Sequence, residues 1–219
     1  MDRPPWILDE VAHAGDEHLD PAYVVTYNDK AHVDPTEDLA LLRTLGLNKR
    51  SVLVDLGAGS GAFALAAAAL CRRVVAVDVS PAMFATLRAQ GREHGLGNVE
   101  GVQGGFLTYV HQGDPADVVY SRHALHHLPD FWKATALVRV SSIMQPGGVL
   151  RLRDLVYACE PCDIERVIEP WLAAGAARPE DGCVRFQDAP HAPHIESPPE
   201  QQNSRLLATP ALPTRQKEW

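Results

Sequence analysis

The stretch VLVDLGAGSGAFAL, residues 52–65, constrains the fold more than any other part of the sequence. An apolar, β-branched run leads into a glycine-rich turn, and an alanine-rich run follows. This order is typical of a strand, a tight turn and a helix in a βαβ unit. Glycine permits φ > 0 and lacks the Cβ that would keep a ligand away from the backbone. Gly57, Gly59 and Gly61 therefore predict a small-molecule site at the carboxyl edge of a sheet.

Strand and helix patterns alternate along the middle of the chain. The strands are expected at 51–57, 73–80, 98–104, 116–121 and 149–156. The helices are expected at 34–47, 60–71, 80–95 and 129–145. Strands that alternate with helices of this length favour a mostly parallel sheet covered on both faces. Right-handed crossovers then make it a doubly wound α/β fold.

The composition divides the chain into three parts. Residues 1–34 are polar and weakly periodic, and we interpret them as an N-terminal cap segment whose Tyr23, Tyr27 and His32 could cover the site. Residues 35–182 carry the alternating pattern and form the domain. Residues 183–219 are punctuated by prolines, so we expect a mostly irregular tail.

The charge and the apolar runs narrow the classes of partner. The formal net charge of −8 repels phosphate backbones, so no nucleic-acid partner is expected. The N-terminus lacks the basic and apolar regions of a signal peptide, and the longest apolar run, 62–70, is too short to span a bilayer. We therefore expect a cytoplasmic protein without a membrane partner.

The cysteines do not predict a metal site. The CEPC stretch, Cys159 to Cys162, is followed by His191 and His194, but their separation is longer than the roughly 12–15 residues of a compact zinc finger. We expect free thiols and no bound metal.

Two classes of ligand fit the glycine turn. Gly57, Gly59 and Ala62 match a dinucleotide fingerprint, and Asp78 follows after about twenty residues, where a ribose-binding carboxylate is expected. A nicotinamide cofactor therefore fits the spacing. Asp55, just before the glycines, is poorly placed for a pyrophosphate because like charges repel. It suits a ligand with a cationic group, such as an α-amino group.

Four motifs in order carry a family resemblance. They are VLVDLGAGSG, VVAVDVSPAMFATLR, DVVYSRHALHHLPD and MQPGGVLRLRD. Together they resemble class I S-adenosylmethionine-dependent methyltransferases over about residues 50–155. The resemblance implies a seven-stranded, Rossmann-like sheet that ends in a strand hairpin. It also implies methyl transfer from S-adenosylmethionine to an acceptor, most often a small molecule in members with these motifs. Because 183–219 does not supply the hairpin pattern, we expect an altered tail that lacks it.

The resemblance also assigns roles to residues. Asp55, Gly57, Ala58 and Gly59 would lie along the methionyl part of the cofactor, and Asp78 would hold the ribose hydroxyls. Val79 and Met83 would lie near the adenine, although Met83 also fits a helix-face core position. Ser121 and Arg122 would border the sulfonium and the acceptor.

One position departs from the family pattern. Gly105 stands where the family usually has an acidic residue that accepts a hydrogen bond from the adenine amine. Backbone or water could replace that bond, so position 105 stays in the predicted cofactor site. The departure also keeps open a non-catalytic, degenerate cofactor-binding domain, beside the less favoured NAD-dependent oxidoreductase. The sequence identifies neither the acceptor nor the oligomeric state.

The histidines after the fourth strand are the candidate catalytic residues. His123, His126 and His127 titrate near neutral pH and lie next to the predicted site. We predict that His123 or His126 acts as a base or contacts the acceptor. In the other interpretation, LHHLPD only starts a helix and closes a pocket.

Overall fold

The computed structural model describes residues 4–24, 34–154, 161–166, 169 and 205–208. Its strands are β1 (Val52–Leu56), β2 (Arg73–Asp78), β3 (Val99–Gln103), β4 (Ala116–Arg122), β5 (Met144–Arg153) and β6 (Arg205–Ala208). Its α-helices are α1 (Asp16–Leu19), α3 (Thr36–Thr44), α4 (Ala62–Ala68), α5 (Pro81–Glu93) and α6 (Asp130–Ile143). Short 3₁₀ turns are η1 (Val11–His13), η2 (Leu125–His127) and η3 (Pro161–Asp163).

The strands form one sheet in the order β3-β2-β1-β4-β5-β6. Strands β1 to β5 pair in parallel, and β6 pairs antiparallel with β5. Every residue of β1 is buried, which is the pattern of a parallel strand covered on both faces. The predicted strands, their helices and the doubly wound α/β class are confirmed.

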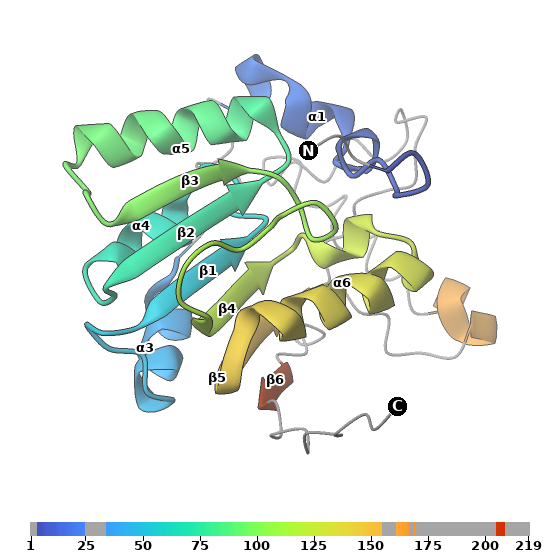
Figure 1. The fold of residues 1–219 in the computed structure, drawn as a ribbon. Helices are drawn as coiled ribbons and strands as arrows, with labels where there is room; N and C mark the ends of the chain where they lie inside the picture. Colours follow the sequence, from blue (N-terminus) through green and yellow to red (C-terminus); the bar gives the residue numbers. More distant parts are fainter. Residues whose placement is uncertain (1–3, 25–33, 155–160, 167–168, 170–204, 209–219) are drawn as a thin grey trace.

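Helices cover the two faces of this sheet unequally (Figure 1). Helices α3, α4 and α5 pack on one face, where Leu42, Phe63 and Leu87 meet Leu53 and Val74. Helix α6 covers the other face, and the loop of residues 104–115 between β3 and β4 adds Tyr109 to that core. Within that loop the structure has turns but no helix.

The start of β5 differs from the prediction. The helix was expected to end at 145 and the strand to begin at 149, but α6 runs directly into β5 at Met144. The pairing of β4 with β5 shifts register between Ala116 and Val118, so the extra residues are accommodated as an irregularity in the ladder.

The tail also differs from the prediction in its described part. Residues 183–219 were expected to be mostly irregular, yet Arg205–Ala208 pairs with Val149–Leu152 of β5. This pairing satisfies backbone groups that an edge strand would leave open. These four residues form a strand within a tail that was expected to be mostly irregular. Residues 183–204 and 209–219 lie outside the described residues, so the expectation for the tail as a whole stays a prediction.

A buried ion cluster fixes α3 to the sheet. Asp38 is 1% exposed, and its carboxylate accepts hydrogen bonds from the Arg151 Nε and Nη2, at 2.8 and 2.6 Å, and from the Tyr120 hydroxyl at 2.8 Å. Arg153 Nη1 lies 3.1 Å from the same carboxylate. Burial works against the charge, but these hydrogen bonds outweigh it and lower the pKa of Asp38 below its usual value.

The strand order reverses around β1, which pairs with β2 on one side and β4 on the other. The chain leaves β1 and β4 at the same edge of the sheet, and their following loops diverge there. Open α/β sheets bind ligands at this kind of switch point. Among the described residues, no helix combines the length and apolar character that a membrane crossing requires.

Candidate functional site

The glycine turn after β1 is built from left-handed residues. Gly57, Gly59 and Gly61 have φ of 77°, 56° and 95°. A Cβ on Gly57 would overlap the Ala124 Cβ of the loop after β4. The Gly57 and Ala58 N–H groups both donate to the Val77 carbonyl oxygen, at 2.9 and 3.0 Å. Glycine at position 57 thus lets the two loops meet at the switch point.

Asp78 ends β2 and holds this turn. Its Oδ2 accepts a hydrogen bond from the Gly59 N–H at 2.7 Å, and its Oδ1 accepts one from the Ser80 N–H at 2.9 Å. Burial raises the pKa of Asp78, although the two backbone donors counteract part of that rise. The sequence placed Asp78 beside the glycine turn, and the structure brings them into direct contact.

Asp55 lies beneath the same turn, inside the sheet. It is 2% exposed, and its Oδ2 is one of the buried side-chain oxygens without a hydrogen-bond partner among the described residues. Burial, and next the nearby Asp78, raise the pKa of Asp55 well above its usual value. An incoming cation would relieve both effects, since it would compensate the charge that burial disfavours.

A cavity of about 90 Å³ connects these elements. Of the residues predicted to bind cofactor, Gly57, Gly59, Asp78, Val79 and Gly105 line it, as do Met83 and Arg122. Asp55, Ala58 and Ser121 do not line it: Asp55 and Ser121 are buried in their strands, and Ala58 packs against the core. Most of the predicted cofactor residues therefore meet at one place.

The candidate catalytic histidines separate into two environments. His123 lines the cavity and has a φ of 50°, which is unusual for a residue with a side chain. Burial, and next the neighbouring Arg122, lower the pKa of His123 to about 4, so it is neutral at physiological pH. His126 lies outside the cavity lining, next to His127, which does line it; the two ring centroids are 4.3 Å apart.

Asp154 orients His126. The carboxylate lies 2.6 Å from His126 Nδ1 and accepts a hydrogen bond from the His126 backbone N–H at 3.0 Å. Because a carboxylate acceptor favours a proton on Nδ1, the basic nitrogen of neutral His126 is Nε2. Sequence reasoning did not identify Asp154, because a carboxylate directly after a strand carries no sign of this pairing.

The N-terminal segment forms the roof of the cavity. Glu10, Ala14 and His18 line it, and sequence reasoning named none of them. The suggested cover residue Tyr23 packs edge-on against His18, with ring centroids 5.8 Å apart. Tyr27 and His32 lie outside the described residues. The roof therefore comes from the predicted cap segment, but mainly through other residues.

Ser80 joins this roof to the domain. Its Oγ accepts a hydrogen bond from the Met83 N–H at 3.1 Å, which caps the start of α5. The hydroxyl also donates to the His18 carbonyl oxygen at 2.6 Å. One side chain thus serves the helix and the N-terminal segment together.

Replacing Ser80 with alanine is expected to destabilise the protein by about 1 kcal/mol, because the α5 cap is lost. The same change should speed hydrogen exchange in residues 14–19, since the bond to His18 is lost too. Urea unfolding and exchange mass spectrometry measure the two effects. Ser142→Ala, which removes an exposed hydroxyl bonded to the Arg139 carbonyl oxygen, is the matched control. Equal behaviour of the two variants would contradict the assignment.

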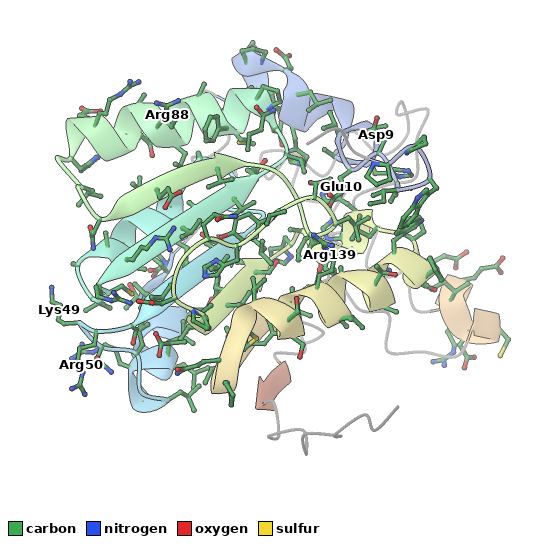
Figure 2. All side chains as sticks on the ribbon, viewed as in Figure 1. Asp9, Glu10, Lys49, Arg50, Arg88 and Arg139 are labelled. Atoms are coloured by element: carbon green, nitrogen blue, oxygen red, sulfur yellow. The ribbon has the colours of Figure 1, made fainter. Side chains whose placement is uncertain are left out.

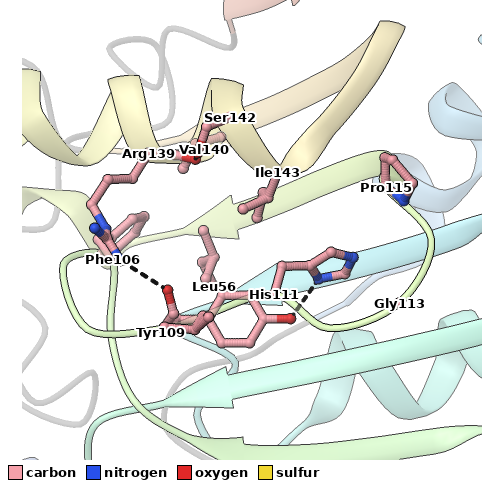
Figure 3. A pocket seen from close by; sticks show the side chains of 11 residues that line it. Leu56, Phe106, Tyr109, His111, Gly113, Pro115, Arg139, Val140, Ser142 and Ile143 are labelled. Carbon is pink, nitrogen blue, oxygen red and sulfur yellow. Dashed lines mark hydrogen bonds between the residues drawn. The ribbon is translucent and has the colours of Figure 1, made fainter. Parts of the chain in front are cut away.

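A larger cavity, of about 350 Å³, lies on the α6 side (Figure 3). The Tyr109 hydroxyl contacts His111 Nδ1 at 2.7 Å, and Arg139 donates to the Tyr109 carbonyl oxygen at 3.1 Å. Burial raises the pKa of Tyr109 to about 12. Neither the glycine turn nor Asp78 lines this cavity. We assign the site to the smaller cavity because titratable groups and bare backbone converge there.

The structure describes only one member, Cys162, of the cysteine–histidine set that the sequence offered as a metal site. Cys71 and Cys162 are free thiols, whereas Cys159, His191 and His194 lie outside the described residues. Among the residues that the structure does describe, no group of three or more His, Cys, Asp or Glu could hold a metal ion.

Comparison with known proteins agrees with this arrangement. Residues 53–148 match the model of a methyltransferase domain family. The uncharacterized methyltransferase YcgJ of Bacillus subtilis is 29% identical over 58% of this chain and 50% of its own length. A trans-aconitate 2-methyltransferase of Methylobacterium radiotolerans is 32% identical over 61% of this chain and 51% of its own. The chain thus spans about half the length of these curated relatives.

A solved structure extends the comparison to three dimensions. The DhpI complex with S-adenosylhomocysteine is 28% identical, has a TM-score of 0.51, and is matched over 69% of this chain and 71% of its own. The family match, the sheet order and the glycine turn agree. Residues 53–148 match a methyltransferase domain of the class I, S-adenosylmethionine-dependent kind, and this part of the chain has a Rossmann-like fold.

Proposed function

We propose that this chain binds S-adenosylmethionine at the glycine turn and transfers its methyl group to a small-molecule acceptor. The observation that carries the proposal is the buried Asp55 carboxyl beneath the turn, whose Oδ2 has no hydrogen-bond partner in the described part of the chain. A pyrophosphate would meet two carboxyl groups there, whereas the α-amino group of a methionyl chain would meet a compensating charge. This favours S-adenosylmethionine over a nicotinamide dinucleotide.

The other predicted residues take roles along the cavity. Asp78 would accept hydrogen bonds from the ribose hydroxyls, in exchange for part of its contact with Gly59. Val79 and Met83 supply apolar surface for the base. Gly57, Ala58 and Gly59 allow the methionyl part to approach bare backbone, and Ser121 borders the reacting end. Since ligand pockets usually exceed about 300 Å³, the cavity must widen when the cofactor binds.

The cofactor supplies an activated methyl group, and the chain's own residues position the acceptor. His123, neutral and on the cavity wall, contacts the acceptor. His126, oriented by Asp154 and adjacent to His127 of the cavity wall, takes the acceptor's proton through Nε2. Two observations support a small-molecule acceptor: the acidic net charge of this chain, and the small carboxylate, trans-aconitate, in the name of one relative.

Transfer is tested with S-adenosylmethionine that carries a labelled methyl group and a panel of small carboxylates, phenols and amines. We expect labelled product and S-adenosylhomocysteine to form in equal amounts with at least one acceptor class, as measured by mass spectrometry. Binding of S-adenosylhomocysteine without transfer to any acceptor in the panel would instead favour the non-catalytic cofactor-binding domain.

With an acceptor in hand, His126→Ala is expected to lower kcat by about 100-fold, because a positioned general base is worth roughly that factor. His111→Ala is the matched control, since His111 lies in the other cavity. Steady-state kinetics measures both variants. Turnover by His126→Ala at the wild-type rate would remove His126 from the mechanism.

A further inference from the structure

Glu10 is a buried carboxyl group that the assigned roles leave unexplained. It is 6% exposed, and it lies on the inner side of the N-terminal segment, toward the loop after β3 (Figure 2). The adjacent Asp9 is exposed. Charged residues are rarely buried this fully unless they have a partner. The burial of the Glu10 carboxyl group in the wall of the cavity therefore suggests that it binds part of the ligand.

Its carboxylate is held by the loop that contains Gly105. The Leu107 N–H donates to Glu10 Oε1 at 3.1 Å, and the Thr108 hydroxyl donates to Oε2 at 2.9 Å. Thr108 Oγ in turn accepts a hydrogen bond from the Gly105 N–H at 2.9 Å. The backbone N–H groups of Phe106 and Thr108 also interact with the Glu10 carboxylate. Because a carboxylate accepts about four hydrogen bonds, a donor from the cavity would take the place of one of these two backbone contacts.

Gly105 and Glu10 are complementary in shape. A Cβ on Gly105 would lie 2.5 Å from Glu10 Cδ, closer still to Oε1, and 2.6 Å from Val79 Cγ1. Any side chain at position 105 would thus enter the space of the Glu10 carboxyl group. The space that a side chain at position 105 would fill is occupied by the carboxyl group of Glu10, which lies 105 − 10 = 95 positions earlier in the chain.

We propose that Glu10 is the specificity residue that recognises the base of the cofactor, by accepting a hydrogen bond from the exocyclic amine of adenine. This rests on the proposed function, since a ribose bound at Asp78 directs its base past Val79 toward Gly105. An ionised carboxylate only accepts hydrogen bonds, so it selects a donor edge. Adenine presents an amine at that edge, whereas hypoxanthine presents a carbonyl oxygen.

The assignment makes the N-terminal segment part of the cofactor site. The bond from Ser80 to His18 and the bonds from Leu107 and Thr108 to Glu10 fix the segment at two points. Cofactor binding then adds a third, between the base and Glu10. The domain therefore recognises its base through a residue outside the alternating strand–helix pattern.

The test compares two ligands, S-adenosylhomocysteine and S-inosylhomocysteine, by calorimetric titration of the full chain. The wild type is expected to bind the adenosyl ligand about tenfold more tightly or better, because a hydrogen bond to a charged group contributes about that factor to affinity. Glu10→Gln keeps the size of the side chain, and its amide can donate to the carbonyl of the inosyl ligand. We expect its preference to fall to within about threefold or to reverse.

Glu37→Gln, on the exposed surface of α3, is the control and should keep the wild-type preference. If Glu10 only holds the N-terminal segment in place, Glu10→Gln weakens the binding of both ligands by the same factor and leaves the preference unchanged. That result would overturn the role of Glu10 in base recognition but would leave the proposed cofactor site intact. If the wild type binds neither ligand, the proposed function fails, and the role of Glu10 fails with it.

Discussion

Replacing Asp55 with asparagine is expected to make the ligand-free protein more stable and, at the same time, to weaken S-adenosylhomocysteine binding by about 100-fold. Burial raises the pKa of Asp55 well above its usual value, so holding the carboxylate ionised at neutral pH costs folding free energy. Asparagine has the same shape without that cost. It also lacks the charge that would bind the α-amino group, a charge-assisted bond worth about 2–3 kcal/mol.

The sign of the pH dependence follows from the raised pKa. A carboxyl group whose pKa is higher in the folded state contributes stability below its unfolded pKa, 3.8 here, and loses it as the pH rises through the folded value. The stability advantage of Asp55→Asn should therefore be present at neutral pH and should disappear as the pH falls below the unfolded value, 3.8.

Urea unfolding across this pH range, together with calorimetric titration at neutral pH, measures both effects. Asp114→Asn is the control, because Asp114 is exposed and pairs only at the surface with Arg72. It should change neither property appreciably. An Asp55→Asn protein that is less stable at neutral pH, or that binds S-adenosylhomocysteine normally, would contradict the role of Asp55 as a buried receptor for a cation.

The second large effect is expected at Asp38, which does not line the candidate cavity. Asp38→Ala leaves two arginines and a tyrosine hydroxyl without their buried acceptor. Removing one partner of a buried ion cluster typically costs about 3–5 kcal/mol. We therefore expect a loss of that size in urea unfolding at neutral pH, which is a large share of the stability of a domain this small.

The acid sensitivity of this cluster has the opposite sign to that of Asp55. Hydrogen bonds lower the pKa of Asp38, so the stability that it contributes is present above its unfolded pKa, 3.8, and is lost as the pH falls through the folded value. The difference between wild type and Asp38→Ala should therefore shrink at acid pH. A loss below about 1 kcal/mol at neutral pH, no larger than that of an exposed pair, would show that the cluster does not anchor α3.

Local patterns predicted the part of the site that is local in sequence. The glycine turn follows from three glycines after a β-branched run, and the Ser80 cap follows from a serine before Pro81. Asp78 followed from its spacing to the glycines. Each prediction rested on residues within one strand–turn–helix unit, or on a spacing that the parallel βαβ unit fixes.

Contacts between distant segments could not be predicted in this way. Asp38 looked like an ordinary first-turn acid of a helix, and only the alternation of Arg151 and Arg153 in β5 indicated charges in need of a buried partner. Glu10 lay in a polar segment without a period. The nearest signal was the absence of an acid at Gly105, and a missing residue does not say which other residue replaces it.

The histidines show a further limit. Their position after β4 placed them near the site, but residue type alone did not separate His123, on the cavity wall, from His126, adjacent to His127. That difference depends on the left-handed backbone at His123 and on Asp154 at the end of β5. Both arise from how two strands end side by side, which the sequence pattern does not specify.

The central claim is that the glycine turn and Asp78 bind S-adenosylmethionine rather than a nicotinamide cofactor. Calorimetric titration of the purified chain with S-adenosylhomocysteine and, separately, with NAD tests it most directly, with Asp78→Ala and Asp114→Ala as the matched pair. We expect micromolar binding of S-adenosylhomocysteine and no binding of NAD, with the affinity lost in Asp78→Ala and kept in Asp114→Ala. Binding of NAD, or no binding of either ligand to the folded chain, would contradict it.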